Sequence, residues 1–143
     1  MKKLLLASVL TLALPAVAYG TTSKTLPNTT IQQAKKEMKD AFCQDGRQGV
    51  IKLVSNCYLE SNNKDKCMLE DSVLIVFDKQ MDDMFKAQSG QGVNPDGFLS
   101  DTAVETRARI YFNPRFGSVK NAMKYFSKAG NDIINTMREC EKN

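Results

Sequence analysis

The sequence predicts an all-α fold: a single-domain bundle of about five helices that is stapled by disulfides. In five segments of the 143-residue chain, apolar residues recur at the three- and four-residue spacing of an amphipathic helix. No segment of useful length alternates between apolar and polar residues as a half-buried strand does. The four cysteines follow a segment typical of export signals, and an even number of cysteines in an exported chain indicates disulfides.

The first 20 residues have the pattern of a secretory signal peptide. Two lysines precede an apolar run over residues 4–18, and residues 16–18 have the small-residue form of a cleavage site. We expect cleavage after Ala18 or Gly20. The run is shorter than the roughly 20 apolar residues that span a bilayer, so a membrane anchor is the weaker alternative. The protein is therefore expected to reach the periplasm or the extracellular space.

The rest of the chain fits one domain of ordinary size. Residues 21–29 are polar and are expected to form a flexible leader, and residues 30–143 to form the helical domain. The whole chain has 20 Lys and Arg against 16 Asp and Glu, and loss of Lys2 and Lys3 leaves 18 against 16. This near-neutral balance gives no general reason to expect nucleic acid as a partner. No later segment is long and apolar enough to span a membrane.

Turn residues separate the expected helices. Asp45-Gly46 divides the first helix from the second, and the polar residues 61–65 divide the second from the third. The third helix is the longest and most regular, and the turn over residues 94–97 precedes the fourth. The expected helices are residues 30–43, 47–60, 66–87, 101–112 and 119–140.

Capping residues and helix breakers set the expected helix ends. The hydroxyl of Thr29 or Thr30 is expected to cap the first helix, and that of Ser100 the fourth. Asn113-Pro114 is expected to end the fourth helix, because the residue before a proline avoids the helical region. Gly130 lies within the fifth helix at a cost of about 1 kcal/mol relative to alanine, which leaves open whether that helix is continuous.

The positions of the cysteines favour one disulfide pairing. Cys57 and Cys67 flank the turn between the second and third helices, so they should meet at the closed end of a helical hairpin. Cys43 and Cys140, at the ends of the first and fifth helices, are then left to pair. The pairing Cys43–Cys57 with Cys67–Cys140 remains the alternative. The spacing does not match a redox-active or zinc-binding CxxC motif.

The absence of histidine narrows the possible chemistry. It excludes Ser-His-Asp and Cys-His hydrolysis in their usual forms, and HExxH zinc sites. No calcium-binding loop of the DxDxDG type is present either. The sequence therefore predicts no cofactor and no metal site.

Carboxylates are the remaining acid–base groups. Asp78 and Asp82 lie one turn apart on the third helix and could share a proton or bind a hard cation. The simpler interpretation is a solvated face on which Asp82 pairs with Lys86 and Asp83 with Lys79. A hydrolase that depends on Asp or Glu and acts on a glycan or cell-wall substrate is an alternative function. It requires two carboxylates about 5 to 9.5 Å apart in a cleft.

Positive charge collects in the C-terminal third of the chain. Three lysines recur there at every fourth residue and share one helix face, and three arginines precede them. Such a strip could bind an acidic protein or an anionic envelope component, although a solubilising face is the simpler interpretation. The candidate partner-binding residues are Arg107, Arg109, Arg115, Lys120, Lys124 and Lys128.

These observations favour a non-catalytic binding protein over an enzyme. We expect an exported, periplasmic protein of the inhibitor, immunity or chaperone type, which binds its partner through a rigid surface. A periplasmic structural or stress-response protein is a further alternative to the hydrolase. The sequence specifies neither the partner nor the oligomeric state.

Overall fold

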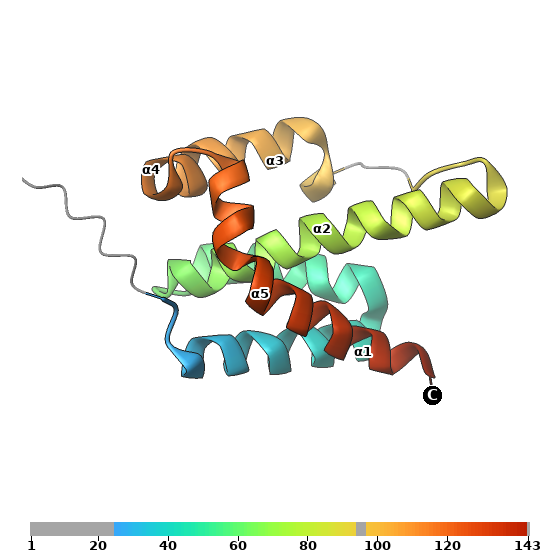
Figure 1. Ribbon diagram of the computed structural model, residues 1–143, viewed down its shortest axis with the longest axis horizontal. Helices are drawn as coiled ribbons and strands as arrows, with labels where there is room; N and C mark the ends of the chain where they lie inside the picture. Colours follow the sequence, from blue (N-terminus) through green and yellow to red (C-terminus); the bar gives the residue numbers. More distant parts are fainter. Residues whose placement is uncertain (1–24, 94–96, 143) are drawn as a thin grey trace, which may run out of the picture.

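The structure is a computed structural model that describes residues 25–93 and 97–142, and over these ranges the chain forms helices and no strand. Figure 1 shows a helical bundle, which confirms the all-α fold with its two disulfides. The expected signal peptide, its cleavage sites and residues 21–24 of the expected leader lie outside the described residues. The rest of the expected leader is described, and its last two residues, Asn28 and Thr29, already belong to the first helix. None of the helices within the described ranges has the length and apolar character that a membrane crossing requires.

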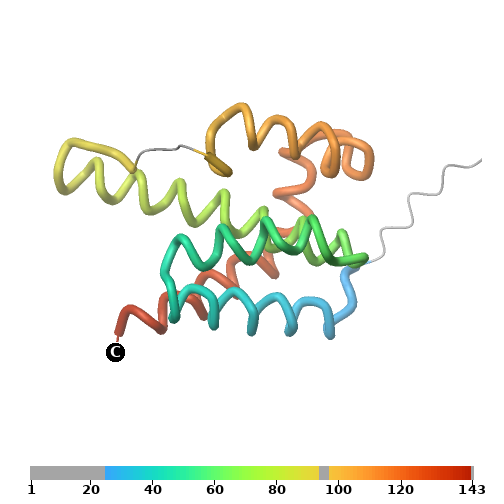
Figure 2. Tube along the Cα trace, turned by 180° about the vertical axis from the view of Figure 1, so that it is seen from behind, coloured from blue at the N-terminus to red at the C-terminus, as the bar shows by residue number. Residues whose placement is uncertain are grey.

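Helix α1 (Asn28–Glu60) reverses its direction at Gly46. The backbone there has φ 58° and ψ −143°, a combination that side chains other than glycine rarely tolerate. The two halves of the helix consequently run antiparallel, side by side (Figure 2). They approach closely at Gly49, where a Cβ atom would overlap the backbone oxygen of Ala41. The break expected at Asp45-Gly46 is therefore a sharp reversal between two helical halves.

The start of α1 differs from the sequence expectation. The helix begins at Asn28, and no side chain caps it. The prediction of a cap by Thr29 or Thr30 is wrong, because both residues already lie within the first turn. The carbonyl of Pro27 accepts the first helical hydrogen bond, from the N–H of Ile31 at 3.2 Å, so the helix starts earlier than expected.

Helix α2 (Lys64–Ser89) passes through the centre of the bundle (Figure 1). The side chain of Asn63 caps it by accepting a hydrogen bond from the N–H of Lys66 at 3.1 Å. Its first half is buried around its whole circumference, whereas its second half extends beyond the other helices. Met84 and Phe85 on that second half are 45% and 41% exposed.

The fourth expected helix is divided into two segments, and a third helical segment follows it directly. Helix α3 (Asp101–Arg107) begins after Ser100, whose hydroxyl accepts a hydrogen bond from Ala103 N–H at 3.3 Å, as the sequence predicts. A π-helical turn (Ala108–Phe112) and the short helix α4 (Asn113–Phe116) continue the helical path. The prediction that Asn113-Pro114 ends the helix is wrong. Pro114 has no N–H to donate, and it lies in the first turn of α4, where none is needed.

Helix α5 (Val119–Met137) is continuous through Gly130. The hydroxyl of Ser118 caps its start by accepting a hydrogen bond from Asn121 N–H at 3.1 Å. Gly130 is buried against α2, and a Cβ atom at this position would lie 3.5 Å from Cγ2 of Val73. A short 3₁₀ turn (Arg138–Lys142) follows the helix.

Helices α1, α2 and α5 pack against one another and enclose most of the core, while α3 and α4 form a layer on one side of α2 (Figure 1). The Cys57–Cys67 disulfide closes the hairpin of α1 and α2, with 5.5 Å between the Cα atoms. The Cys43–Cys140 disulfide fastens the C-terminal turn to α1, with a Cα separation of 5.4 Å. These are the pairs that the order of the helices predicts.

Candidate functional site

One of the six candidate partner-binding residues lies in the core. Arg107 donates from Nε and Nη2 to the carboxylate of Asp71, at 2.8 and 3.1 Å, and its Nη1 donates to the carbonyl of Phe98 at 2.6 Å. Asp71 is fully buried, and Arg107 is 7% exposed. The prediction that Arg107 contributes to a binding surface is therefore wrong, because its guanidinium joins α3 to α2 inside the protein.

Tyr58 completes this buried network from α1. Its hydroxyl donates to Oδ2 of Asp71 at 3.0 Å, and its ring stacks on that of Tyr111 with 4.2 Å between the centroids. Burial and the neighbouring carboxylate raise the pKa of Tyr58, so the hydroxyl stays protonated and remains a donor. The network thus connects α1, α2 and the α3–α4 layer, and its role is structural.

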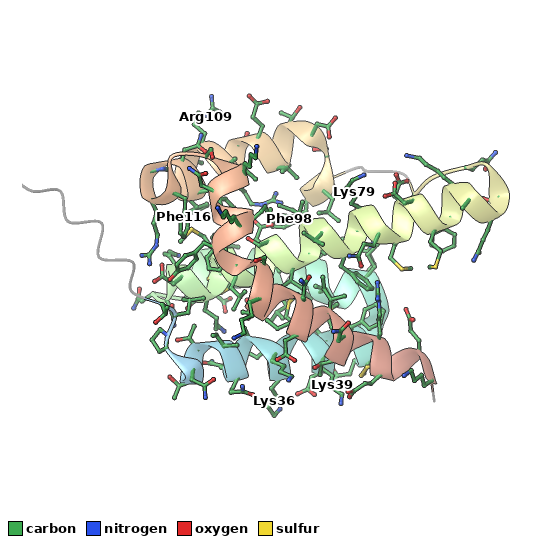
Figure 3. All side chains as sticks on the ribbon, viewed as in Figure 1. Lys36, Lys39, Lys79, Phe98, Arg109 and Phe116 are labelled. Atoms are coloured by element: carbon green, nitrogen blue, oxygen red, sulfur yellow. A yellow bond between two sulfur atoms is a disulfide. The ribbon has the colours of Figure 1, made fainter. Side chains whose placement is uncertain are left out.

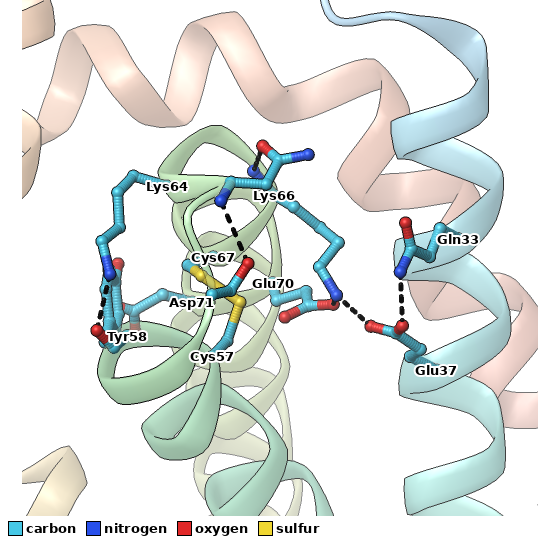
Figure 4. The surroundings of a disulfide bond; sticks show 11 residues. Gln33, Glu37, Cys57, Tyr58, Lys64, Lys66, Cys67, Glu70 and Asp71 are labelled. Carbon is cyan, nitrogen blue, oxygen red and sulfur yellow. Dashed lines mark hydrogen bonds and ion pairs between the residues drawn. A yellow bond between two sulfur atoms is a disulfide. The ribbon is translucent and has the colours of Figure 1, made fainter.

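A second buried charge lies beside the Cys57–Cys67 disulfide (Figure 4). Lys66 forms ion pairs with Glu37 of α1 and with Glu70, the latter at 3.6 Å. Glu70 is fully buried, and its carboxyl oxygens have no hydrogen-bond partner. Burial raises its pKa to about 8, although Lys66 acts in the opposite direction. A carboxylic acid of this kind resembles a general acid, but Glu70 is enclosed by protein.

An open cleft of about 890 Å³ lies between α2 and the α3–α4 layer. Apolar side chains including Ile75, Leu99 and Val104 line part of it. Figure 3 shows Lys79 on the side of α2 that faces α3, and Phe98 and Phe116 on the inner side of the α3–α4 layer. Lys79 lines the cleft, whereas Phe98 and Phe116 do not. Acidic side chains from both walls also line it: Asp78, Asp82, Asp101 and Glu105.

Cations of the same chain hold the carboxylates on the α2 wall of this cleft. Asp78 accepts a hydrogen bond from Nε of Arg47 at 2.6 Å. Asp82 pairs with Lys86 at 2.5 Å, and Asp83 with Lys79 at 3.4 Å, as the simpler interpretation of this helix predicts. Lys86 lowers the pKa of Asp82, which keeps this carboxyl group ionised at neutral pH. The pairing therefore disfavours a shared proton between Asp78 and Asp82.

The cleft and the two buried carboxyl groups with raised pKa values, Glu70 and Asp71, occupy different places. A glycoside hydrolase needs a proton donor with a raised pKa next to a second carboxylate in the same cleft. Burial raises the pKa of Glu70 and of Asp71, but neither residue lines this cleft, whereas Asp78 and Asp82 line it as members of ion pairs. The structure therefore places neither of the carboxyl groups with raised pKa values beside the acidic side chains of the cleft.

The other two candidate arginines do not join the lysines in one surface. Arg109 is exposed and lies at the edge of the cleft between α2 and α3. Arg115 forms an ion pair with Asp65 at 2.8 Å, which links α4 to the start of α2. The arginine part of the predicted strip is therefore dispersed over three different environments.

The three lysines remain as a group on α5. Lys120, Lys124 and Lys128 are exposed, and in the described parts of the chain no carboxylate lies within 4 Å of their ammonium groups. We refer to them as the lysine row. Six other lysines of the described chain form ion pairs with carboxylates: Lys35, Lys36, Lys39, Lys66, Lys79 and Lys86. Three more, Lys52, Lys64 and Lys142, have no carboxylate partner among the described residues, but each is the only such lysine on its element.

A pocket of about 520 Å³ adjoins the end of the lysine row, between the start of α1 and α5; we call it the α1–α5 pocket. Lys128 lines it together with apolar parts of Leu26, Ile31, Tyr125 and Ala129. The sequence gives no sign of this pocket, because its two walls come from segments about a hundred residues apart in the chain. No local spacing in the sequence connects them.

No family model, no curated protein sequence and no solved structure matches this chain. Within residues 25–93 and 97–142, no three or more Asp, Glu or Cys side chains gather in a form that could hold a metal ion. The function is therefore argued from the geometry of the chain itself.

Proposed function

We propose that this chain is an exported, non-catalytic binding protein of the inhibitor, immunity or chaperone type, and that the lysine row on α5 is the surface that holds its partner. The observation that carries the proposal is that three exposed ammonium groups without a carboxylate within 4 Å share one face of α5, whereas the other described lysines without an ion pair, Lys52, Lys64 and Lys142, lie singly on other elements. Exposed charges without an intramolecular partner are available for electrostatic recognition, which accelerates association and selects partners of opposite charge.

Two structural features support this proposal. Helix α5 packs against α1 and α2, and the disulfides fasten these two helices to each other and the C-terminal turn to α1. A surface on such a cross-linked bundle is preorganised and loses less entropy on binding. Disulfides persist in oxidising compartments such as the periplasm, which fits the expected export. The partner of a basic row of this kind is a protein with an acidic surface, or an anionic component of the envelope.

Affinity capture from the native envelope fraction tests the proposal. The bait is the wild-type protein or the triple variant Lys120→Gln/Lys124→Gln/Lys128→Gln. The matched control is Lys36→Gln/Lys52→Gln/Lys142→Gln, which removes the same charge from exposed positions elsewhere. We expect the first triple variant to recover at least about tenfold less partner than the wild-type protein. A tenfold loss of affinity requires only about 1.4 kcal/mol of binding free energy, divided among the three lost charges.

The control triple variant is expected to recover the same partner as the wild-type protein. Higher ionic strength should weaken capture by the wild-type protein, because exposed charges are screened by salt. Equal recovery by both triple variants, with helical content unchanged in circular dichroism, would contradict the assignment of the lysine row.

A further inference from the structure

We infer that the lysine row and the α1–α5 pocket form one composite site for an acidic polypeptide segment, whose carboxylates face the lysines while one apolar side chain fills the pocket. This inference rests on the proposed function and specifies the class of its partner. It requires three properties of this surface: contact between the row and the pocket, an apolar pocket wall of fixed shape, and a preference for a polypeptide over a bilayer.

Lys128 provides the contact, because it belongs to the lysine row and also lines the pocket. The row spans two helical turns, or about 12 Å along the axis of α5. Its ammonium groups are thus spaced about 6 Å apart along the axis, which matches carboxylates one turn apart on a helix. A ligand that follows the row in the direction of Lys128 arrives at the opening of the pocket.

The pocket can accept an apolar side chain. Leu26 and Ile31 form its wall on the α1 side, and Tyr125 and Ala129 form its wall on α5. The ring of Tyr125 packs against those of Phe116 and Phe126, with centroids 5.1 and 5.0 Å away, which fixes this wall in place. A volume of about 520 Å³ lies in the range of ligand-binding pockets.

The charges around the pocket also favour an acidic ligand. The pocket contains one carboxylate, that of Asp132. Lys35 forms an ion pair with it at 2.9 Å, so its negative charge is compensated within the protein. Lys128 has no such partner among the described residues, and the net charge at the pocket is therefore positive.

The shape of the surface favours a polypeptide over a membrane. Proteins that bind bilayers electrostatically also insert protruding apolar side chains beside their basic residues. The large apolar side chains that are exposed in the described chain are Leu59, Met84, Phe85 and Ile110, and none of them belongs to α5. The apolar feature next to the lysine row is concave, so the partner must supply the protruding group, as a side chain in a hot-spot contact does.

Fluorescence anisotropy with designed peptides tests this inference on the intact protein. The probe is a labelled helical peptide with three glutamates at every fourth position and one leucine a turn beyond the last. Matched peptides replace the leucine by alanine, or the glutamates by glutamine. We expect the leucine peptide to bind at least about tenfold more tightly than the alanine peptide, because burying one such side chain contributes about 1.5–3 kcal/mol.

Substitutions at neighbouring glutamines test where the leucine binds. Gln32 lines the pocket and is exposed, so Gln32→Trp should obstruct the pocket without disturbing the core. Gln33 is exposed but does not line the pocket, so Gln33→Trp is the matched control. In Gln32→Trp the leucine peptide is expected to bind less than about threefold more tightly than the alanine peptide. In Gln33→Trp the difference in affinity should stay near tenfold.

The results separate the two proposals. Equal binding of the leucine and alanine peptides, or no binding of either, overturns the composite site. If capture of the native partner still depends on the lysine row, the proposed function survives. If the lysine-row variant binds every peptide and the native partner as the wild-type protein does, the composite site and the proposed function both fail. Sedimentation with phosphatidylglycerol vesicles is the competing measurement. Binding to vesicles that Gln32→Trp leaves unchanged, in the absence of peptide binding, would favour a membrane partner and overturn the inference.

Discussion

Arg107 and Arg109 lie only two residues apart, yet their environments differ completely. Arg107 contacts the buried carboxylate of Asp71 through two hydrogen bonds, whereas Arg109 is exposed at the edge of a cleft. Removing one member of a buried ion pair leaves the other charge in the core without compensation. The position of each side chain, and not its charge, therefore determines its contribution to stability.

Arg107→Ala is expected to lower the free energy of unfolding by about 3–5 kcal/mol, because Asp71 would remain buried and unpaired. Arg109→Ala is the matched control and is expected to change it by less than about 0.5 kcal/mol, as exposed substitutions usually do. Urea unfolding followed by circular dichroism measures both. Similar losses in the two variants would show that the Asp71–Arg107 pair does not stabilise the fold.

Glu70 makes the stability of the protein sensitive to pH. Its pKa in the folded protein is about 8, above the ordinary value of 4.5, because burial disfavours the charged form. The unfolded chain therefore releases this proton at a lower pH than the folded protein does. Ionisation of Glu70 consequently reduces the stability of the folded state as the pH rises from about 4.5 to 8.

Glu70→Gln is expected to reduce the loss of stability between pH 5 and pH 9 by about 2 kcal/mol or more, because the amide does not ionise. The measurement is the difference in the free energy of urea unfolding between these two pH values. Glu60→Gln, at an exposed position at the end of α1, serves as the control and should keep the pH dependence of the wild-type protein. An unchanged pH dependence in Glu70→Gln would contradict the attribution of the loss of stability to the ionisation of Glu70.

At the scale of the helices, two glycines have opposite roles. Gly49 permits the close approach of the two halves of α1, since a Cβ atom there would overlap the backbone of Ala41. Gly130 lies within the continuous helix α5, and a Cβ atom there would make an ordinary contact with Val73 at 3.5 Å. Only the first position therefore requires glycine.

Gly130→Ala is expected to stabilise the protein by up to about 1 kcal/mol, the difference in helix propensity between the two residues. Gly49→Ala is expected to destabilise it by about 1–3 kcal/mol, because added volume in a packed contact forces backbone shifts. Thermal unfolding of the two variants shows the sign of each effect. A lower melting temperature for Gly130→Ala would mean that α5 and α2 pack too closely to accept a methyl group.

The sequence predicts the helices better than it predicts the contacts between them. The break at Gly46, the cap at Ser100 and the cysteine pairs all follow from turn residues and the order of the helices. The helix end at Asn113-Pro114 was wrong, because a π turn before Pro114 keeps the chain helical and the rule for residues before proline describes a tendency.

Contacts over long sequence separations explain the other differences. Arg107 shares the apolar face of its helix with Val104 and Ala108. This position on the apolar face is the one feature of the sequence that indicates its burial. Its partner Asp71 is 36 residues away, so no local pattern identifies the pair. The α1–α5 pocket was missed for the same reason.

At the scale of the whole molecule, the disulfides connect stability to the proposed function. The Cys43–Cys140 bridge joins residues 97 positions apart, and the chain-entropy argument gives such a bridge a contribution of nearly 5 kcal/mol. The Cys57–Cys67 bridge closes a 10-residue separation, for which about 3 kcal/mol is expected. Together they join α1 to α2 and the C-terminal turn to α1, and α5, which carries the lysine row, packs against this cross-linked pair of helices.

The proposed role requires an exported protein whose helices are locked by these two bridges. Mass spectrometry of the protein isolated from its native cells, alkylated without reductant and then digested, tests this requirement directly. We predict an N-terminus after Ala18 or Gly20, no alkylated cysteine, and cross-linked peptides that join Cys43 to Cys140 and Cys57 to Cys67. A cytosolic protein that retains residues 1–20 and carries four alkylated cysteines would contradict it.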